Sequence, residues 1–257
     1  MTERRVWTAH LMGTVFSIHL IGAIEKDIAD AAVDAFFAEL ADVERVFSPF
    51  RKDSDISRLR RGALTLGAAD PRVREVAAAC TVAERATRGR FSAWWRGDFD
   101  PTGYVKGWSV DDAGSRHLEP LLTCAVAVGV DAGGDVRVWT APDARWSWRI
   151  GVADPHRPGS VLATLELTDG AVATSGTAER GAHIVDPRTG LLALTVRSAT
   201  VVADTLADAD VWATAAVVAG AGDLSWIGAP QITSGMTVGA DAAVRRWIRG
   251  VEVVTAA

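Results

Sequence analysis

The order of helical and strand patterns along the chain constrains its fold more than any other feature. Residues 14–20 alternate as a strand does, and residues 25–47 carry apolar side chains at helical spacing after an acidic start. The other elements predicted, in chain order, are a short helix capped by 53–55 and ending at 59, helices over 71–87 and 106–118, strands over 124–130, 135–139, 146–152, 162–167, 171–174, 191–195 and 197–203, a helix over 207–219, and a tail from 231 with short strands around an Ala/Arg-rich helical stretch.

This order predicts an α+β fold with a largely antiparallel sheet flanked by helices, rather than a doubly wound parallel sheet. A chain of 257 residues can bury about 70–75% of the surface that its unfolded form exposes. No repeat, low-complexity tract or Pro/Ser-rich linker divides the sequence, so we predict a single domain over residues 1–257.

Charge and hydropathy exclude several classes of partner. The net charge is −5, so we expect no binding to nucleic acid or anionic lipid. No stretch of 18 apolar residues occurs, and the N-terminus lacks the apolar core of a signal peptide, so we expect a cytoplasmic protein without membrane insertion. Cys80 and Cys124 both stand in apolar surroundings, which predicts two core thiols. The cluster of Arg58, Arg60 and Arg61 suits a salt-bridged helix face better than a phosphate grip.

Residues 100–108, with the sequence DPTGYVKGW, could form a phosphate site. Gly103 lets a backbone approach a ligand closely. We expect Lys106 to open a helix, where free N–H groups and a cation together favour an anion. The alternative is a turn that caps a helix and carries a solvated lysine.

Two glycine-rich segments could line a ligand. Residues 130–137, VDAGGDVR, form either a tight hairpin around Asp135 or a backbone surface for a flat ligand. Residues 173–180, ATSGTAER, are followed by HIVDPRTG over 183–190. His183 could act there as a general acid or base, because histidine titrates near neutral pH, or it could simply end a strand before a turn.

Asp210 and Thr214 are four residues apart on a predicted helix, so they share one face. Carboxylate and hydroxyl oxygens are hard ligands that suit Mg²⁺, although such a pair is also commonplace on helices. The phosphate loop GxxxxGK[ST], the metalloprotease motif HExxH, CxxC and a dinucleotide-type GxGxxG are all absent.

The order of these segments resembles the FAD:protein FMN transferase family, also called the ApbE family. The matching pieces are Met12-Gly-Thr14, FSPF at 47–50, DSDISRL at 53–59, Gly89-Arg-Phe91, DPTGYVKGW, DAGGDVR, ATSGTAER, HIVDPRTG and SATVVADTLADADVWATA at 198–215. They span residues 12 to about 220.

The resemblance implies an ApbE-like, T-fold-like protein that binds FAD and Mg²⁺. It implies metal ligands at Asp210, Thr214 and the Gly103 carbonyl, and catalytic roles for His183, Lys106 and Asp210. The FAD contacts that it implies are Met12, Phe50, Arg90, Phe91, Ser92, Asp100, Lys106, Asp135, His183 and Ile184.

The reaction implied is attack by a Ser or Thr hydroxyl of an acceptor protein on the FMN-side phosphorus of FAD, with release of AMP. Three positions depart from the family pattern: Ser92 replaces an Asp, Val105 replaces an Ala, and Arg60 or Arg61 replaces an Asn. The ten tryptophans suit a planar-ligand pocket, to which we assign Trp94, Trp95 and Trp108, and are also compatible with a homodimer interface.

Three other functions fit the same residues. With water as the nucleophile, the site would be an Mg²⁺-dependent FAD pyrophosphatase that releases FMN and AMP. Without a metal, the chain would be a non-catalytic FAD-binding protein. The remaining alternative is an α+β domain that binds an unrelated ligand.

Overall fold

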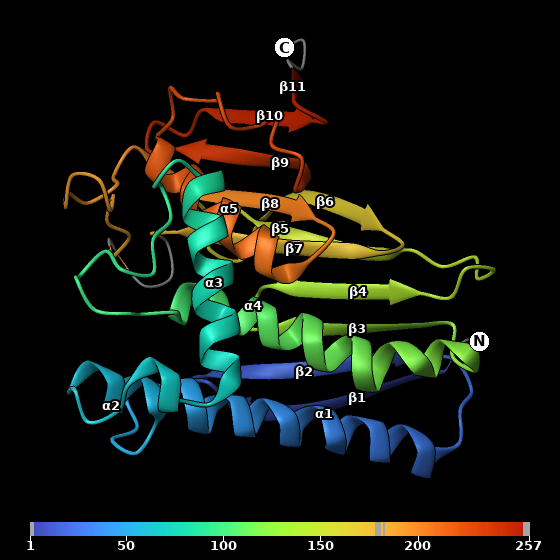
Figure 1. Ribbon diagram of the computed structural model, residues 1–257. Helices are drawn as coiled ribbons and strands as arrows, with labels where there is room; N and C mark the ends of the chain where they lie inside the picture. Colours follow the sequence, from blue (N-terminus) through green and yellow to red (C-terminus); the bar gives the residue numbers. More distant parts are fainter. Residues whose placement is uncertain (1–2, 178–180, 182, 254–257) are drawn as a thin grey trace.

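A long antiparallel sheet forms the framework of the computed structural model, which describes residues 3–177, 181 and 183–253 (Figure 1). Its strands follow the spatial order β1, β2, β3, β4, β7, β8, β9, β10, β11, and every neighbouring pair is antiparallel. The strands are β1 (Arg4–Leu11), β2 (Thr14–Ile21), β3 (Ala127–Ala132), β4 (Val136–Thr140), β7 (Gly170–Gly176), β8 (Val196–Ala203), β9 (Ile232–Gly239), β10 (Val244–Ile248) and β11 (Val251–Val253).

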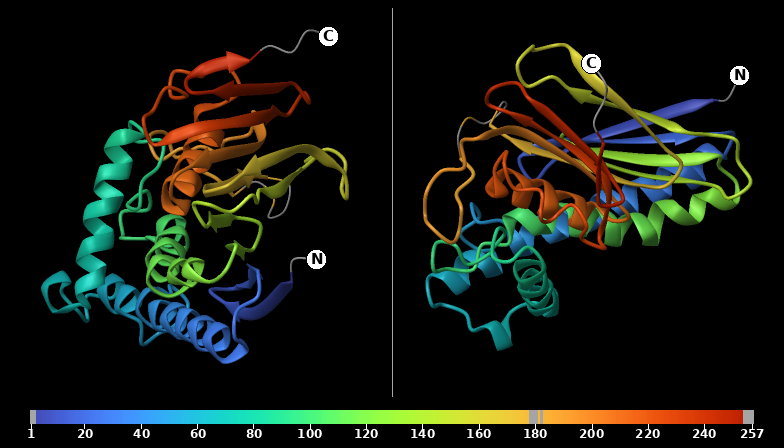
Figure 2. Two further views of the ribbon diagram at one scale, coloured as in Figure 1. Left: turned by 90° about the vertical axis from the view of Figure 1, so that its right-hand side faces the viewer. Right: turned by 90° about the horizontal axis from the view of Figure 1, so that it is seen from above.

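The helices cover one face of this sheet, and a separate hairpin lies over the other face (Figure 2). The hairpin is β5 (Trp148–Ala153) and β6 (Val161–Leu167). The helices are α1 (Lys26–Phe47), α2 (Asp55–Arg60), α3 (Pro71–Ala86), α4 (Thr102–Ala113) and α5 (Leu206–Ala219), with short turns η1 (Leu66–Ala68), η2 (Gly114–Leu118) and η3 (Glu119–Thr123). The α+β class with a largely antiparallel sheet is therefore confirmed.

The main core lies between the sheet and the helical layer. Phe16, Ile18 and Leu20 alternate along β2 and are fully buried, as the period of a strand requires. The α1 side chains that meet them recur at helical spacing and are Ala29, Val33, Phe36 and Leu40. A second core joins the end of α1, α2, α3 and the segment before α4. Two cores thus hold the helices against the sheet and against one another.

Helices α4 and α5, which carry Lys106 and Asp210, pack closely against each other. A Cβ atom on Gly107 would lie 2.8 Å from backbone atoms of Ala207, so only glycine allows this approach. The Asp111 carboxylate accepts hydrogen bonds from the N–H groups of Leu206 and Ala207, each at 2.9 Å. It therefore caps α5 from the side of α4.

The buried Asp111 carboxyl should make stability depend on pH. Burial raises its pKa to about 6, against 3.8 for an ordinary Asp, although the two N–H bonds and Arg137 oppose the shift. The folded protein binds this proton more tightly than the unfolded chain does. The protonated Asp111 carboxyl therefore stabilises the fold fully below pH 3.8, and this stabilisation is lost as the pH rises through about 6. We expect the unfolding free energy of the wild type, minus that of Asp111→Asn, to fall by on the order of 2 kcal/mol across this window.

Urea unfolding at several pH values would measure this difference. Asp143→Asn, at an exposed loop carboxylate, is the control and should give a flat difference. A difference that stayed constant or grew with pH for Asp111→Asn would contradict the prediction.

Several sequence expectations were wrong. β1 was not expected, residues 191–195 form a single bridge from Leu192 to Val185 instead of a strand, and the Ala/Arg-rich stretch forms β10 instead of a helix. β10 pairs with β9 on one side and β11 on the other, so strand pairing overrides the helical propensity of its residues. Cys80 is buried as predicted, whereas Cys124 is exposed at the end of η3. No helix among the described residues is both long and apolar enough to cross a membrane.

Candidate active site

Lys106 is the centre of the candidate site. It lies in the second turn of α4, and its ammonium group donates a hydrogen bond to the Asp135 carboxylate. Its Nζ atom also lies 3.6 Å from Oδ2 of Asp210 on α5. The Lys106 side chain thus links α4, the start of β4 and α5. Lys106, Asp135 and Asp210 together form the Lys–Asp–Asp cluster.

The expectation that Lys106 opens a helix was wrong. α4 begins at Thr102, whose N–H and hydroxyl both donate to Oδ1 of Asp100, at 3.2 and 2.7 Å. An Asp followed by Pro101 starts a helix through its own side chain, so the free N–H groups of the first turn precede the lysine. Lys106 therefore contributes through its ammonium group.

Asp135 is held rigidly between the sheet and α4. It is 8% exposed, and its Oδ1 atom accepts a hydrogen bond from the backbone N–H of Thr174 on β7 at 2.9 Å. The preceding turn contains Gly133 and Gly134, with φ angles of +70° and +96°. DAGGD is therefore a hairpin turn that also delivers a carboxylate to the cluster.

Asp210 and Thr214 lie on α5 and face different partners. Asp210 meets Lys106, while the Thr214 hydroxyl lies 3.0 Å from the Ser175 hydroxyl on β7. Gly103, in the first turn of α4, lies against Phe91, because a Cβ atom there would be 3.2 Å from its ring. Within the described residues, no group of three or more His, Cys, Asp or Glu could hold a metal ion.

Met12 lies in the turn between β1 and β2 and contacts α4. Its backbone adopts a left-handed conformation with φ of +51°, and its sulfur lies 4.0 Å from the Ser109 hydroxyl. Ser109 follows Lys106 by three residues on α4, so both occupy one side of the helix. The structure thus brings Met12 near the cluster.

The segment before α4 is anchored by an arginine. Arg60 donates to the Phe99 carbonyl at 3.2 Å and lies 3.1 Å from the Asp100 carboxylate. Arg58 pairs with Asp55, and Arg61 donates to the Lys52 carbonyl. Arg58 and Arg60 therefore form ion pairs, as the interpretation as a salt-bridged face predicts, whereas Arg61 contacts a backbone carbonyl.

The other predicted FAD contacts lie in varied surroundings. Phe50 is 93% exposed, whereas Phe91 is buried in the second core. The Ser92 hydroxyl accepts a hydrogen bond from the backbone N–H of Trp94 at 3.1 Å. Arg90 is ion-paired with Asp223 at 2.5 Å. No described contact joins these four residues to the Lys–Asp–Asp cluster.

His183 is exposed and lies beside a partly described segment. Its Nδ1 atom is 2.9 Å from the Gly181 carbonyl, while Ile184 packs against the main core. Residues 178–180 of the ATSGTAER motif lie outside the described residues, as does residue 182. If Nδ1 carries the proton that bonds to Gly181, Nε2 is left as the basic nitrogen.

The predicted tryptophans have separate partners. The Trp94 and Phe99 rings are tilted against each other with centroids 5.3 Å apart, and the Trp108 and Phe47 ring centroids are 5.8 Å apart. Both pack against the second core, while Trp95 lies under the Arg96 guanidinium. The polar contacts that sequence reasoning missed are those of Thr174, Ser175 and Ser109, none of which has a signal beyond its place in a motif.

The fold and the cluster define an α+β protein with a cationic lysine held between two carboxylates at the helix-covered face of an antiparallel sheet. The sequence model of the ApbE family matches residues 12–96 and 96–233, which is most of the chain. This protein belongs to the ApbE family.

Individual relatives agree with that assignment. The chain is 41% identical over 97 residues to an FAD:protein FMN transferase of Treponema pallidum (strain Nichols), an alignment covering 34% of this chain and 26% of the relative. It is 35% identical over 143 residues to an FAD:protein FMN transferase of Rhodobacter capsulatus, covering 52% and 26%. The matched part thus spans about a quarter of each curated relative. The crystal structure of an ApbE protein from Thermotoga maritima has the same fold, with a TM-score of 0.81, 22% identity and coverage of 95% and 97%.

Proposed function

We propose that this protein transfers the FMN part of FAD to a Ser or Thr hydroxyl of an acceptor protein and releases AMP. The observation that carries the proposal is the Lys106 ammonium group held between the Asp135 and Asp210 carboxylates. Membership of the ApbE family, and two curated relatives named FAD:protein FMN transferase, support the same reaction.

In this reaction the acceptor oxygen bonds to the FMN-side phosphorus, the bond to the AMP phosphate oxygen breaks, and AMP leaves with the electron pair. Negative charge builds up on the phosphates, so a fixed cation is the main requirement. Lys106 supplies that cation, and Asp135 holds its ammonium group in place. We assign the hydroxyl proton to Nε2 of His183, whose other ring nitrogen lies beside the Gly181 carbonyl.

Oxygen donors on α4 and α5 would suit a magnesium ion. Mg²⁺ prefers hard oxygen ligands and keeps several waters or substrate phosphate oxygens, so it needs few groups from the protein. Asp210 and Thr214 would supply a carboxylate and a hydroxyl, and the Gly103 carbonyl a third oxygen, with Ser175 orienting the Thr214 hydroxyl. The bound ion would neutralise phosphate charge beside Lys106.

Incubation with FAD, Mg²⁺ and a flavin-acceptor protein should release AMP and add one FMN to the acceptor. AMP would be followed by chromatography and the acceptor by mass spectrometry, and excess EDTA should abolish both. His183→Ala should slow transfer by roughly 10²-fold, because general base catalysis contributes about that much.

Three outcomes would change the proposal. AMP and free FMN without any acceptor would indicate a pyrophosphatase, and FAD binding without AMP release would indicate a binding protein. Transfer at the wild-type rate by His183→Ala would remove the histidine from the mechanism.

A further inference from the structure

A hollow with a volume of about 490 Å³ lies beside His183. Its walls come from the loop between β5 and β6, the residues that follow β7 and β9, the start of β8 and the segments on either side of the 184–193 turn. The residues are His156, Thr177, Gly181, Leu194, Arg197 and Ala240. The carbonyl of Gly181 also lies 2.9 Å from Nδ1 of His183. The hollow therefore adjoins the residue to which we assign the hydroxyl proton.

A short hairpin forms one wall of the hollow. The backbone N–H of Ala193 donates to the Ile184 carbonyl at 2.9 Å, and both side chains pack against the main core. Side chains alternate along an extended segment, so Leu192 and Leu194 project away from that core. They are 48% and 58% exposed. Neighbouring exposed apolar side chains mark an interaction surface, and this one follows His183 directly in the fold.

Arg197 gives the hollow a positive charge. The pairing of β8 with β9 shifts register between Val196 and Ser198, which makes Arg197 the extra residue of a β-bulge. A bulge turns a side chain out of the alternating pattern of its strand. The carbonyl of Arg197 accepts a hydrogen bond from the Thr177 N–H at 3.0 Å, which fixes its backbone. Its side chain is exposed, and no carboxylate in the described part of the chain pairs with its guanidinium.

His156 and Thr177 add polar groups to the hollow. Nε2 of the His156 ring lies 3.0 Å from the Gly239 carbonyl. The backbone N–H of His156 donates to Oδ1 of Asp154 at 2.9 Å, so the histidine is held on both sides. No carboxylate is among the described walls of the hollow. A guanidinium, an imidazole and a hydroxyl together favour a ligand with an anionic group.

The hollow lies close to the Lys–Asp–Asp cluster without being part of it. None of Lys106, Asp135 and Asp210 lines the hollow. The Thr174 N–H donates to Asp135, and Thr177 lies three residues further along the same extended segment, which corresponds to roughly 10 Å. A chain bound in the hollow could therefore extend toward phosphates held at the cluster.

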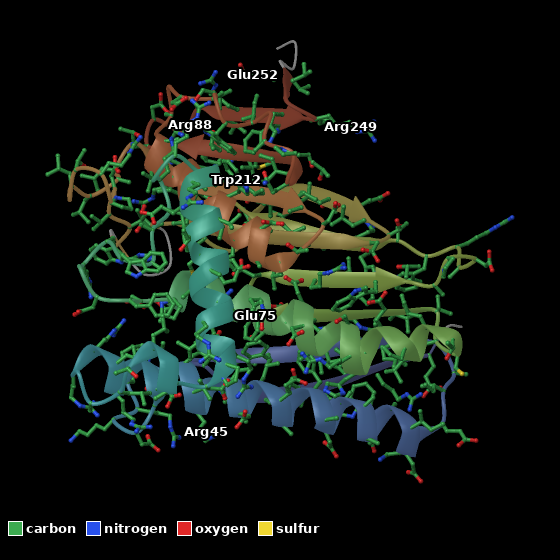
Figure 3. All side chains as sticks on the ribbon, viewed as in Figure 1. Arg45, Glu75, Arg88, Trp212, Arg249 and Glu252 are labelled. Atoms are coloured by element: carbon green, nitrogen blue, oxygen red, sulfur yellow. The ribbon has the colours of Figure 1, made fainter. Side chains whose placement is uncertain are left out.

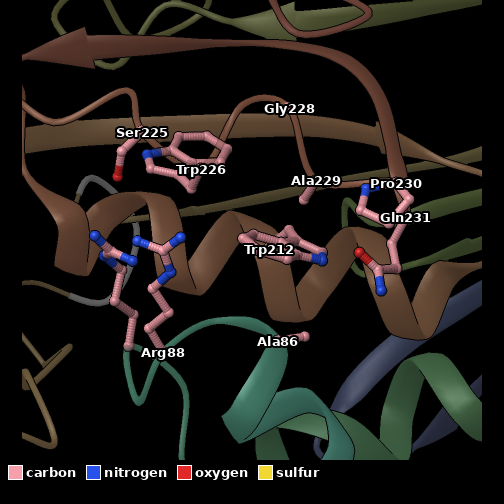
Figure 4. Close-up of a pocket in the computed structure, with 10 residues that line it drawn as sticks. Ala86, Arg88, Trp212, Ser225, Trp226, Gly228, Ala229, Pro230 and Gln231 are labelled. Atoms are coloured by element: carbon pink, nitrogen blue, oxygen red, sulfur yellow. The ribbon is translucent and has the colours of Figure 1, made fainter.

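The hollow near Arg88 and Trp212, where the end of α3 approaches α5, lacks a comparable surface (Figure 3). Trp212 and Trp226 lie along it (Figure 4), but they are only 3% and 5% exposed and belong to the main core. Arg90 in its wall is ion-paired with Asp223. Its groups are thus taken up by the fold itself.

We propose that the hollow beside His183 holds the segment of the acceptor protein that carries the modified Ser or Thr. An Asp or Glu of that segment would pair with the Arg197 guanidinium, and an apolar side chain would lie against Leu194. The hydroxyl would then lie at Nε2 of His183, on the side of the ring away from Gly181. This inference rests on the proposed function and adds to it an acidic residue near the hydroxyl as the feature that selects the acceptor.

Synthetic peptides would test this charge selection. Each carries one Thr in an Ala/Gly host with one Asp at a single position before or after it, and companion peptides carry Asn or Lys at that position. FMN transfer in the presence of FAD and Mg²⁺ is followed by flavin fluorescence of the separated peptides, which gives kcat/KM. At the position that reaches Arg197, the wild type should prefer Asp over Lys by at least about tenfold.

Variants of Arg197 assign that preference to its charge. Arg197→Gln should remove the preference, and Arg197→Glu should reverse it in favour of Lys, which a mere loss of structure would not do. Arg249→Gln is the matched control, because Arg249 is an exposed arginine in the turn between β10 and β11, outside the hollow (Figure 3). It should keep the wild-type preference.

Two results would overturn the proposal. One is equal kcat/KM for the Asp and Lys peptides in the wild type, or an unchanged preference in Arg197→Gln. The other is a fall in FAD affinity, measured by flavin fluorescence, in Arg197→Gln but not in Arg249→Gln, because it would place Arg197 at FAD.

Failure of the proposed function would look different, because no peptide would gain FMN. Binding of fluorescently labelled Asp and Lys peptides to the wild type is then measured by fluorescence anisotropy in the presence of FAD. Tighter binding of the Asp peptide that is lost in Arg197→Gln would still support the hollow as an acidic-peptide site. Equal binding of the two peptides, or none, would overturn it.

Discussion

Lys106→Met is expected to slow the proposed FMN transfer by roughly 10³-fold while the protein stays folded, because removal of a preorganised electrostatic group costs about 10²–10³ in rate. Methionine keeps most of the side-chain length and loses the charge. The Asp135 and Asp210 carboxylates would then face the phosphates of FAD without the cation that now lies beside them. AMP release in a single turnover would measure the rate, and circular dichroism would verify folding.

Lys26→Met is the matched control for this prediction. Lys26 also pairs with a carboxylate, that of Asp30, but on the exposed surface of α1. Water screens an exposed ion pair, so it contributes little to stability, and both rate and stability should change little. A Lys106→Met protein that transferred FMN within about threefold of the wild-type rate would show that the cluster is not the reaction centre.

Gly107→Ala is expected to lower the free energy of unfolding by about 2–3 kcal/mol, through overpacking between two helices. The added Cβ atom would lie 2.8 Å from Cα and N of Ala207, and these backbone atoms cannot rotate away. α4 and α5 would have to separate, which would also strain the Asp111 cap on α5. Thermal and urea unfolding would measure the loss.

Gly67→Ala provides the comparison, because nothing lies within 4 Å of the added Cβ atom and the backbone is not left-handed. This change should be neutral or slightly stabilising. If Gly107→Ala unfolded at the same urea concentration as Gly67→Ala, the prediction that α4 and α5 pack too closely for a Cβ atom at residue 107 would be contradicted.

Local features of the fold could be predicted because they depend on neighbouring residues. α3 begins where Asp70 accepts from the Arg72 N–H at 3.0 Å, with Pro71 at the first helical position. The two glycines of DAGGD adopt positive φ angles in a tight turn, as their sequence favours. In each case the deciding interaction spans only a few residues.

Long-range features could not be predicted in this way. Every second side chain of β1 is exposed, and two of its residues are arginines, so the apolar alternation that predicts a strand is weak there. The strand is stabilised by its pairing with β2. The hydrogen bond from Arg90 to Asp223, far along the chain, has no signal in the sequence around either residue. Which segments become neighbours decides such contacts.

The sequence by itself determined the order of most helices and strands, the α+β class, the shared helix face of Asp210 and Thr214, and the motifs that mark the ApbE family. Only the tertiary structure decided that Lys106 lies between Asp135 and Asp210, and that Arg90 pairs with Asp223. The physical reason is the sequence separation of the interacting residues. The hydrogen bonds of helix caps and turns join residues a few positions apart, whereas these contacts form only when sheet register and helix packing bring distant segments together.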